Sequence, residues 1–228
     1  MDQPESSALN CGISEAESVS KPPSPVNDKP KLTDDILTVA VMGRACAGKT
    51  AILNQYIYKT FIDRYLVTVS DKHMKVVNVD GQQIELAILD TPGGYCFEYG
   101  RRQAIINADA FVLVYSVDEI LSFQRALELM DSIAEKRGNG LQMVIVQTKT
   151  DIRKDKWFEN CEILHTVIPD GLQLPHFQVS AKEGSDMSVI FDEVVQLMQS
   201  DNRTTSTERG EAAFEQIKYV LRGQQIWL

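Results

Sequence analysis

The sequence has few of the residues that mark a secreted or zinc-containing protein. It holds only four cysteines, Cys11, Cys46, Cys96 and Cys161, and three histidines in 228 residues. The cysteines lie far apart and form no CxxC pair, so they predict neither a disulfide framework nor a zinc site. Free thiols are typical of a reducing compartment, and we therefore expect a cytoplasmic location.

Long hydrophobic runs and excess positive charge are also absent. No apolar stretch approaches the roughly 18 residues that a membrane-spanning helix needs, and the first residues are acidic, unlike a signal peptide. The formal net charge of −9 argues against nucleic acid or an anionic membrane as a ligand. The apolar fraction of 43% is ordinary for a globular protein, so most of the chain can bury a core.

Composition divides the chain into three parts. Residues 1–35 contain five of the eight prolines and show no helical or strand periodicity, which predicts a disordered acidic arm. Residues 36–200 form the predicted folded domain. Residues 201–228 are expected to form a polar linker and a short amphipathic C-terminal helix.

Short apolar runs alternate with helical patterns through the folded domain. Residues 36–42, 111–115 and 143–146 have the pattern of buried strands, whereas residues 123–134 and 190–198 have apolar side chains at helical spacing. This alternation predicts an α/β fold with a mostly parallel sheet.

One segment matches a phosphate-binding motif. The residues from 43 to 50 read GRACAGKT, which fits G-x-x-x-x-G-K-[ST] between a predicted strand and a predicted helix. In this motif backbone N–H groups surround the phosphates, Lys49 neutralises the β and γ oxygens, and the Thr50 hydroxyl binds Mg²⁺. The predicted phosphate loop consists of Gly43, Arg44, Ala45, Cys46, Ala47, Gly48, Lys49 and Thr50.

Three further polar loops follow predicted strands. They are Asp90-Thr91-Pro92-Gly93, Thr148-Lys149-Thr150-Asp151 and Ser180-Ala181-Lys182. Ligands of doubly wound sheets bind where the strands end, so these loops and the phosphate loop are expected to form one nucleotide site.

With these four loops, residues 36–200 resemble the Ras-like small GTPases. The resemblance implies the G-domain form of the P-loop NTPase fold, with a mostly parallel six-stranded sheet and helices on both faces. It also implies a molecular switch that binds GTP and GDP with Mg²⁺, hydrolyses GTP and regulates intracellular signalling by binding effector proteins. The alternative is a hydrolysis-deficient G-domain scaffold that acts purely by protein binding.

The resemblance assigns the base contacts to particular residues. Asp151 would accept hydrogen bonds from guanine, Lys149 would pack along the base, and the Ala181 N–H would bind the guanine oxygen. Thr148 replaces the usual asparagine of this loop, as in Rac-type GTPases. Phe61 would contact the edge of the base, and the remaining implied nucleotide contacts come from Ala51, Ser180 and Lys182.

The resemblance also assigns the phosphate and magnesium contacts. Thr50, Thr68 and Asp90 would hold Mg²⁺, with Asp90 acting through water. Tyr65 would cover the phosphates, and the Gly93 N–H would reach the γ-phosphate.

One departure from the Ras pattern bears on catalysis. Gly94 stands where the family has the glutamine that positions the attacking water. With Lys49, Thr68 and Gly94 at the catalytic positions, we expect a small GTPase with slow hydrolysis.

The expected partners follow from the same resemblance. Effectors would bind residues 61–72 and 93–103, and an exchange factor and a GTPase-activating protein are expected as regulators. The first of these segments is more apolar than in Ras, which suggests different effectors. We expect a monomer that binds no nucleic acid and has no membrane anchor of its own, since the chain shows no prenylation motif or polybasic stretch.

Overall fold

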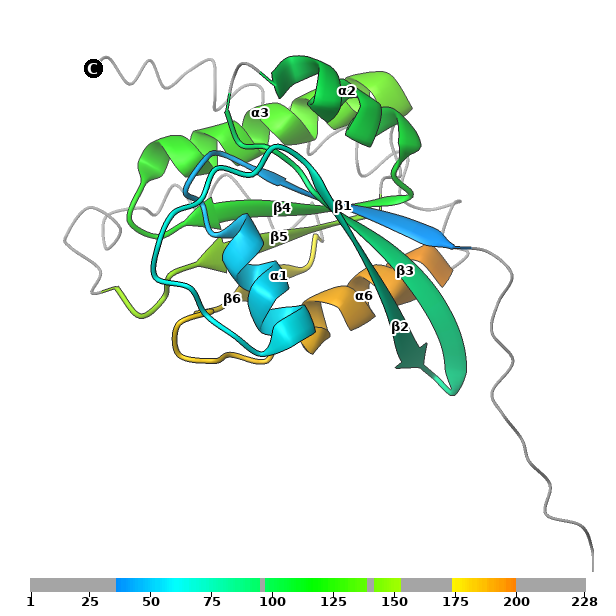
Figure 1. Cartoon of the computed structure of the whole chain (residues 1–228). Coiled ribbons are helices and arrows are strands. Elements are labelled where there is room, and N and C mark those ends of the chain that lie inside the picture. Colours follow the sequence, from blue (N-terminus) through cyan, green and yellow to red (C-terminus); the bar gives the residue numbers. More distant parts are fainter. Residues whose placement is uncertain (1–35, 95–96, 139–141, 153–173, 200–228) are drawn as a thin grey trace, which may run out of the picture.

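The computed structural model describes residues 36–94, 97–138, 142–152 and 174–199, which form a sheet covered by helices on both faces (Figure 1). The elements, in chain order, are β1 (Leu37–Gly43), α1 (Lys49–Tyr58), β2 (Asp71–Val79), β3 (Gln82–Asp90), α2 (Glu98–Asn107), β4 (Ala110–Ser116), α3 (Ile120–Arg137), β5 (Met143–Thr148), β6 (His176–Gln178) and α6 (Ser188–Gln199). The predicted N-terminal arm and C-terminal helix lie outside the described residues.

The sheet has six strands in the order β2-β3-β1-β4-β5-β6. All neighbouring strands are parallel except β2 and β3, which form an antiparallel hairpin. The hairpin turns at Asp80 and Gly81, whose φ angles of 51° and 81° are those of a two-residue turn that favours Asp-Gly. The predicted mostly parallel sheet is therefore confirmed, with β1 and β4 at its centre.

The two faces of the sheet carry separate cores. In β1 the side chains alternate, so that Val39 and Val41 pack toward α1 and α6 while Ala40 and Met42 pack toward α2 and α3. Burial on both faces explains why the central strands are continuously apolar rather than alternating in polarity. No helix in the described part of the chain is long and apolar enough to cross a membrane.

The end of β1 requires a glycine. A Cβ atom at Gly43 would lie 2.2 Å from the carbonyl oxygen of Val114 on β4, which is far closer than any real contact. The missing side chain lets β1 run beside β4 up to the point where the phosphate loop begins. The loops that follow β1, β3, β4 and β5 therefore meet at one edge of the sheet.

An aromatic pair joins α1 to α6 in the core on one face of the sheet. Tyr56 and Phe191 are buried and stacked, with ring centroids 4.1 Å apart. We predict that Phe191→Ala lowers the free energy of unfolding by about 3 to 5 kcal/mol, because it removes a large buried side chain and leaves a cavity. Urea denaturation measures the loss. The matched control is Tyr99→Ala, since Tyr99 is 77% exposed, and its effect should stay within about 0.5 kcal/mol. Equal losses for the two variants would contradict the prediction.

Candidate functional site

A cleft of about 290 Å³ opens at the edge of the sheet where β1 ends. Its walls are the phosphate loop, the first turn of α1, the segment from Phe61 to Thr68, Gly93 and Lys149. Segments that are far apart in the sequence meet there because the parallel strands all end at this edge.

The phosphate loop delivers backbone donors to the cleft. Gly48 has a φ of 92°, and α1 begins immediately after it at Lys49. Within the described residues the helix has no side-chain cap and no acid in its first turn. The free N–H groups of that turn, together with the helix dipole, favour an anion in the cleft.

Lys49 is a buried cation at the base of the loop. Its side chain is 6% exposed, and its Nζ donates a hydrogen bond to the Arg44 carbonyl oxygen at 2.8 Å. Burial lowers the pKa of Lys49 to about 8, although Asp90 and Cys46 act in the opposite direction. A phosphate beside this amine would stabilise the charged form, because an opposite charge offsets the cost of burying it.

Three oxygen-bearing side chains converge next to Lys49. Thr50 Oγ1 donates to Asp90 Oδ2 at 2.5 Å and lies 2.9 Å from Thr68 Oγ1. The other carboxylate oxygen, Asp90 Oδ1, is buried and has no hydrogen-bond partner among the described residues. Burial raises the pKa of Asp90, while the Thr50 hydrogen bond and the charge of Lys49 oppose that rise.

These oxygens fit a magnesium ion. Mg²⁺ is bound through a small number of hard oxygen ligands and retains several waters, and the unpartnered oxygen of Asp90 could accept a hydrogen bond from such a water. No group of three His, Cys, Asp or Glu side chains gathers anywhere in the described ranges. Hydroxyls would therefore have to complete a ligand set around Asp90, and those of Thr50 and Thr68 lie in position to do so.

Thr148 connects the phosphate loop to the sheet. Its buried hydroxyl lies 2.6 Å from the Ala47 carbonyl oxygen and 3.1 Å from that of Tyr115, so the two carbonyls share its single O–H donor, with Ala47 the nearer acceptor. A Cβ atom on Gly48 would come within 3.2 Å of the same hydroxyl. The end of β5 and the phosphate loop are thus joined through the Thr148 side chain.

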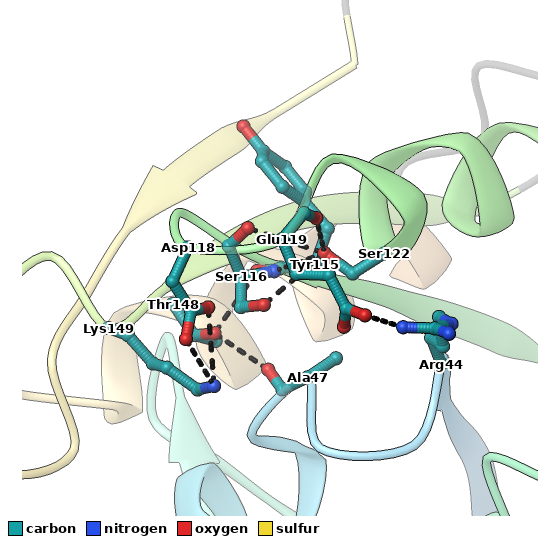
Figure 2. Close-up of polar contacts among 9 residues, drawn as sticks. All are labelled: Arg44, Ala47, Tyr115, Ser116, Asp118, Glu119, Ser122, Thr148 and Lys149. Carbon is teal, nitrogen blue, oxygen red and sulfur yellow. Dashed lines mark hydrogen bonds and ion pairs between the residues drawn. The ribbon is translucent and has the colours of Figure 1, made fainter. Parts of the chain in front are cut away.

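Two ion pairs link the cleft to the start of α3, as Figure 2 shows. Lys149 Nζ lies 3.0 Å from Asp118 Oδ2, and Arg44 pairs with Glu119. Burial disfavours the charged form of Asp118, but hydrogen bonds from Lys149 and Ser116 outweigh it and lower its pKa. Because the two acids are consecutive, one short turn holds both Lys149, which lines the cleft, and Arg44, which adjoins it.

A buried serine fixes the shape of that turn. Ser122 Oγ accepts a hydrogen bond from the Ser116 N–H at 2.9 Å and donates to the Glu119 carbonyl oxygen at 2.6 Å (Figure 2). A local bond of this kind satisfies backbone groups at the start of a helix. The Ser122 hydroxyl thus fixes the backbone from Ser116 to Glu119, which carries the two acids Asp118 and Glu119.

The loop after β6 holds Asp151 in place. Ser180 is fully buried, and its hydroxyl donates to Asp151 Oδ1 at 2.6 Å and accepts from the Glu183 N–H at 3.1 Å. The second oxygen of the carboxylate is left for another donor. Lys182 is exposed at the surface of the same loop.

The loop after β3 packs tightly on the phosphate loop. A Cβ atom at Gly93 would lie 2.3 Å from the backbone nitrogen of Ala45, so a side chain cannot be accommodated there. The carbonyl oxygen of Gly94 accepts a hydrogen bond from the buried Arg101 of α2. Gly94 itself offers no side chain toward the cleft.

The structure sorts the residues singled out in the sequence into three groups. Most of them line the cleft: Ala45, Cys46, Gly48, Lys49, Thr50, Ala51, Phe61, Tyr65, Thr68, Gly93 and Lys149. A second group lies in the strands and loops that adjoin this lining: Gly43, Arg44, Ala47, Asp90 and Thr148. The third group lies on neighbouring loops, outside the lining: Gly94, Asp151, Ser180, Ala181 and Lys182.

The sequence did not point to Asp118 and Glu119. The signal that could have found them is their position, since they follow the end of β4 at the same edge as the other loops. It also left Asn54 unassigned, although this residue of α1 lines the cleft.

Comparison with known proteins gives one consistent result. The family model described as the Ras family matches residues 38–200. The GTP-binding protein Rhes of Homo sapiens is 32% identical over 167 residues, which is 67% of this chain and 61% of that protein. The Mus musculus Rhes is 31% identical over 165 residues, with the same coverage. The chain therefore spans 61% of the length of these relatives.

The family match agrees with the fold and with the four loops at the edge of the sheet. It confirms the expected resemblance to Ras-like small GTPases. The chain belongs to the Ras family of GTP-binding small GTPases.

Proposed function

We propose that this protein is a guanine-nucleotide switch that binds GDP and GTP with Mg²⁺ and hydrolyses GTP slowly. The observation that carries the proposal is the convergence of the Thr50, Thr68 and Asp90 oxygens beside the buried amine of Lys49. Family membership supports guanine nucleotides as the ligands.

Each part of the cleft has a role in this proposal. Thr50, Thr68 and Asp90 hold the magnesium ion, which supplies charge that neutralises the phosphates. Lys49 and the N–H groups of the phosphate loop bind the β and γ phosphates. When the γ-phosphate is present, Thr68 and Gly93 are drawn toward it, and this ordering distinguishes the GTP form from the GDP form.

Asp151 and Lys149 provide base selectivity. The Asp151 carboxylate, held by Ser180, accepts hydrogen bonds from the N1–H and the exocyclic amino group of guanine. Adenine presents no matching pair of donors at these positions. The stem of Lys149 packs along the base while Asp118 fixes its charged end. A site built to accept hydrogen bonds from the ligand discriminates against ligands that lack the matching donors.

The first experiment is displacement of a fluorescent GDP analogue from the purified protein in Mg²⁺. We expect unlabelled GDP and GTP to compete, ATP to compete at least about a thousandfold less well, and EDTA to speed release because the magnesium ligands lose their ion. The bound nucleotide is identified in parallel by ion-exchange chromatography. Equal competition by ATP would contradict the proposed guanine site, and absence of any guanine nucleotide would favour the scaffold alternative.

Slow hydrolysis is expected from Gly94. A residue without a side chain cannot orient the attacking water, so Gly94→Gln should raise the single-turnover rate of GTP hydrolysis roughly tenfold. Gly94→Ala is the control, because alanine adds bulk but no group that could bind water, and its rate should not rise. If Gly94→Gln hydrolyses no faster than the parent protein, the missing glutamine is not the limiting defect and another residue of this segment positions the water.

The Thr148 hydroxyl is expected to govern nucleotide release. Thr148→Val keeps the shape of the side chain but removes the donor shared by the Ala47 and Tyr115 carbonyls, which loosens the phosphate loop. We predict roughly tenfold faster release of the fluorescent GDP analogue, in line with the loss of a buried hydrogen bond. Thr148→Ser retains the hydroxyl and should release nucleotide within about twofold of the parent rate. Equal rates for the two variants would contradict this role.

The proposed effector surface combines residues 61–72 with the edge strand β2. β2 is the outermost strand of the sheet and can pair with a strand from another protein. Leu66, Val67 and Val69 are more than half exposed, and Met74 and Val76 on β2 are exposed beside them. A partner with apolar rather than basic side chains suits this edge, and residues 93–103 would add contacts that depend on the bound nucleotide.

A further inference from the structure

The loop that carries Thr68 is held at its base by side chains of α1 and β2. Residues 59–70 connect the end of α1 at Tyr58 to the start of β2 at Asp71. Within this loop the hydroxyl of Thr68 lies 2.9 Å from that of Thr50, at the proposed magnesium site. Because closing a flexible segment costs entropy, contacts that join α1 to β2 affect how readily Thr68 reaches this position.

Lys75 of β2 bridges the base of the loop. Its Nζ donates a hydrogen bond to the Tyr56 carbonyl oxygen at 2.9 Å and lies 3.4 Å from the centroid of the Tyr56 ring. Side chains alternate along β2, and Val77 is buried in the core shared with α1 and α6, so Lys75 lies on that same face of the strand. One amine thus contacts both the backbone and the side chain of an α1 residue.

The position of this amine suits the end of a helix. The Tyr56 carbonyl lies in the last turn of α1, where carbonyl oxygens lack partners within the helix and the helix dipole is negative. The last turn of α1, all of it described, contains no basic residue. Lys75 therefore supplies the favourable cation from the neighbouring strand, and the negative face of the Tyr56 ring attracts the same charge.

The ring beneath Lys75 is itself fixed in the core. Tyr56 is only 2% exposed and stacks on an aromatic ring of α6. Burial lowers the pKa of Lys75 and the charge of Lys59 acts in the same direction, whereas the carboxylates of Asp192 and Asp186 oppose this and favour the charged amine. The amine therefore ties β2 to a side chain that cannot move without disturbing the core.

A second pair of side chains lies closer to the loop. The rings of Tyr58 and His73 meet edge to face with centroids 6.2 Å apart, and the Tyr58 hydroxyl lies 3.5 Å from His73 Nδ1. Tyr58 is two positions nearer the loop than Tyr56 on α1, and His73 is two positions nearer than Lys75 on β2. The contacts between helix and strand thus continue to the point where residues 59–70 begin.

We propose that Lys75 is a positioning residue for the nucleotide cleft: by fixing the last turn of α1 to β2, it holds residues 59–70 in the conformation that brings Thr68 to the magnesium site. Lys75 is not among the residues that line the cleft, so it acts through the loop. The inference rests on the proposed function, because it concerns how the loop closes over nucleotide and Mg²⁺.

The test compares release of the fluorescent GDP analogue from the whole chain and from its Lys75→Met variant. Methionine keeps an unbranched side chain that can pack on Tyr56, but it has neither the charge nor the donor. In Mg²⁺ we expect Lys75→Met to release the analogue roughly tenfold faster than the parent protein. In EDTA, where Thr68 has no ion to bind, the two rates should agree within about twofold. A merely structural contact would instead affect release under both conditions.

Lys75→Arg and Lys136→Met are the matched controls. Arginine keeps a charged donor that also stacks on aromatic rings, so release from Lys75→Arg should stay within about threefold of the parent rate. Lys136 is exposed on α3, on the opposite face of the sheet from Tyr56. Its replacement by methionine makes the same change in net charge and should leave release unchanged.

Amide hydrogen exchange of the complex with GDP and Mg²⁺ gives a second readout. A loop whose base is loosened opens more often, so residues 61–68 should exchange faster in Lys75→Met than in the parent protein. Lys136→Met should show the parent pattern. Exchange measured across the rest of the domain also shows whether each variant is folded.

Failure of this inference is distinguishable from failure of the proposed function. If the parent protein releases the GDP analogue equally fast in Mg²⁺ and in EDTA, the magnesium-dependent switch is wrong, and this inference with it. If Mg²⁺ slows release from the parent but Lys75→Met behaves identically, Lys75 does not position the loop. The same conclusion follows if Lys75→Met speeds release equally in Mg²⁺ and EDTA, or if hydrogen exchange of residues 61–68 is unchanged.

Discussion

The nucleotide cleft depends on one buried hydrogen-bonding group, the hydroxyl of Thr148. It links the phosphate loop to the paired strands β4 and β5, since it lies within hydrogen-bonding distance of the carbonyl oxygens of Ala47 and Tyr115. Buried carbonyls need donors, so the phosphate loop can take this path only while that hydroxyl remains beneath it. Thr148 stands where this loop more often has the longer asparagine.

Near that contact lie two charged groups, Lys49 and Asp90, whose burial is only partly offset by other groups of the protein. Lys49 and Asp90 are both buried. Burial lowers the pKa of Lys49 and raises the pKa of Asp90, so it favours the neutral form of each side chain. Phosphate and a divalent cation bring the complementary charges, so the same burial that disfavours the empty cleft strengthens the bound state. The two ion pairs at the start of α3 differ from Lys49 and Asp90 in this respect. Both partners of each pair belong to the protein, so Arg44 and Lys149 are positioned without a ligand.

The sequence was sufficient for the parts of the molecule that are encoded locally. The continuous apolar runs of β1, β4 and β5 predict a parallel sheet, and the motif glycines at 43 and 48 predict the phosphate loop with its helix. It could not predict the partner of Arg44, because nothing in the spacing of Arg44 and Glu119 says that they meet. A cleft between α2 and α3 could not be predicted for the same reason: Arg101 and Lys136 line one cleft only because α2 packs on α3.

The consecutive positions of Asp118 and Glu119 limit how this protein can change. The turn between β4 and α3 has one correct length, because inserting or deleting a residue there would move both carboxylates and misalign Arg44 and Lys149 together. A compensating shift of Arg44 alone or of Lys149 alone would restore only one of the two ion pairs. We therefore expect this turn to tolerate substitutions such as Asp for Glu far better than any change in its number of residues.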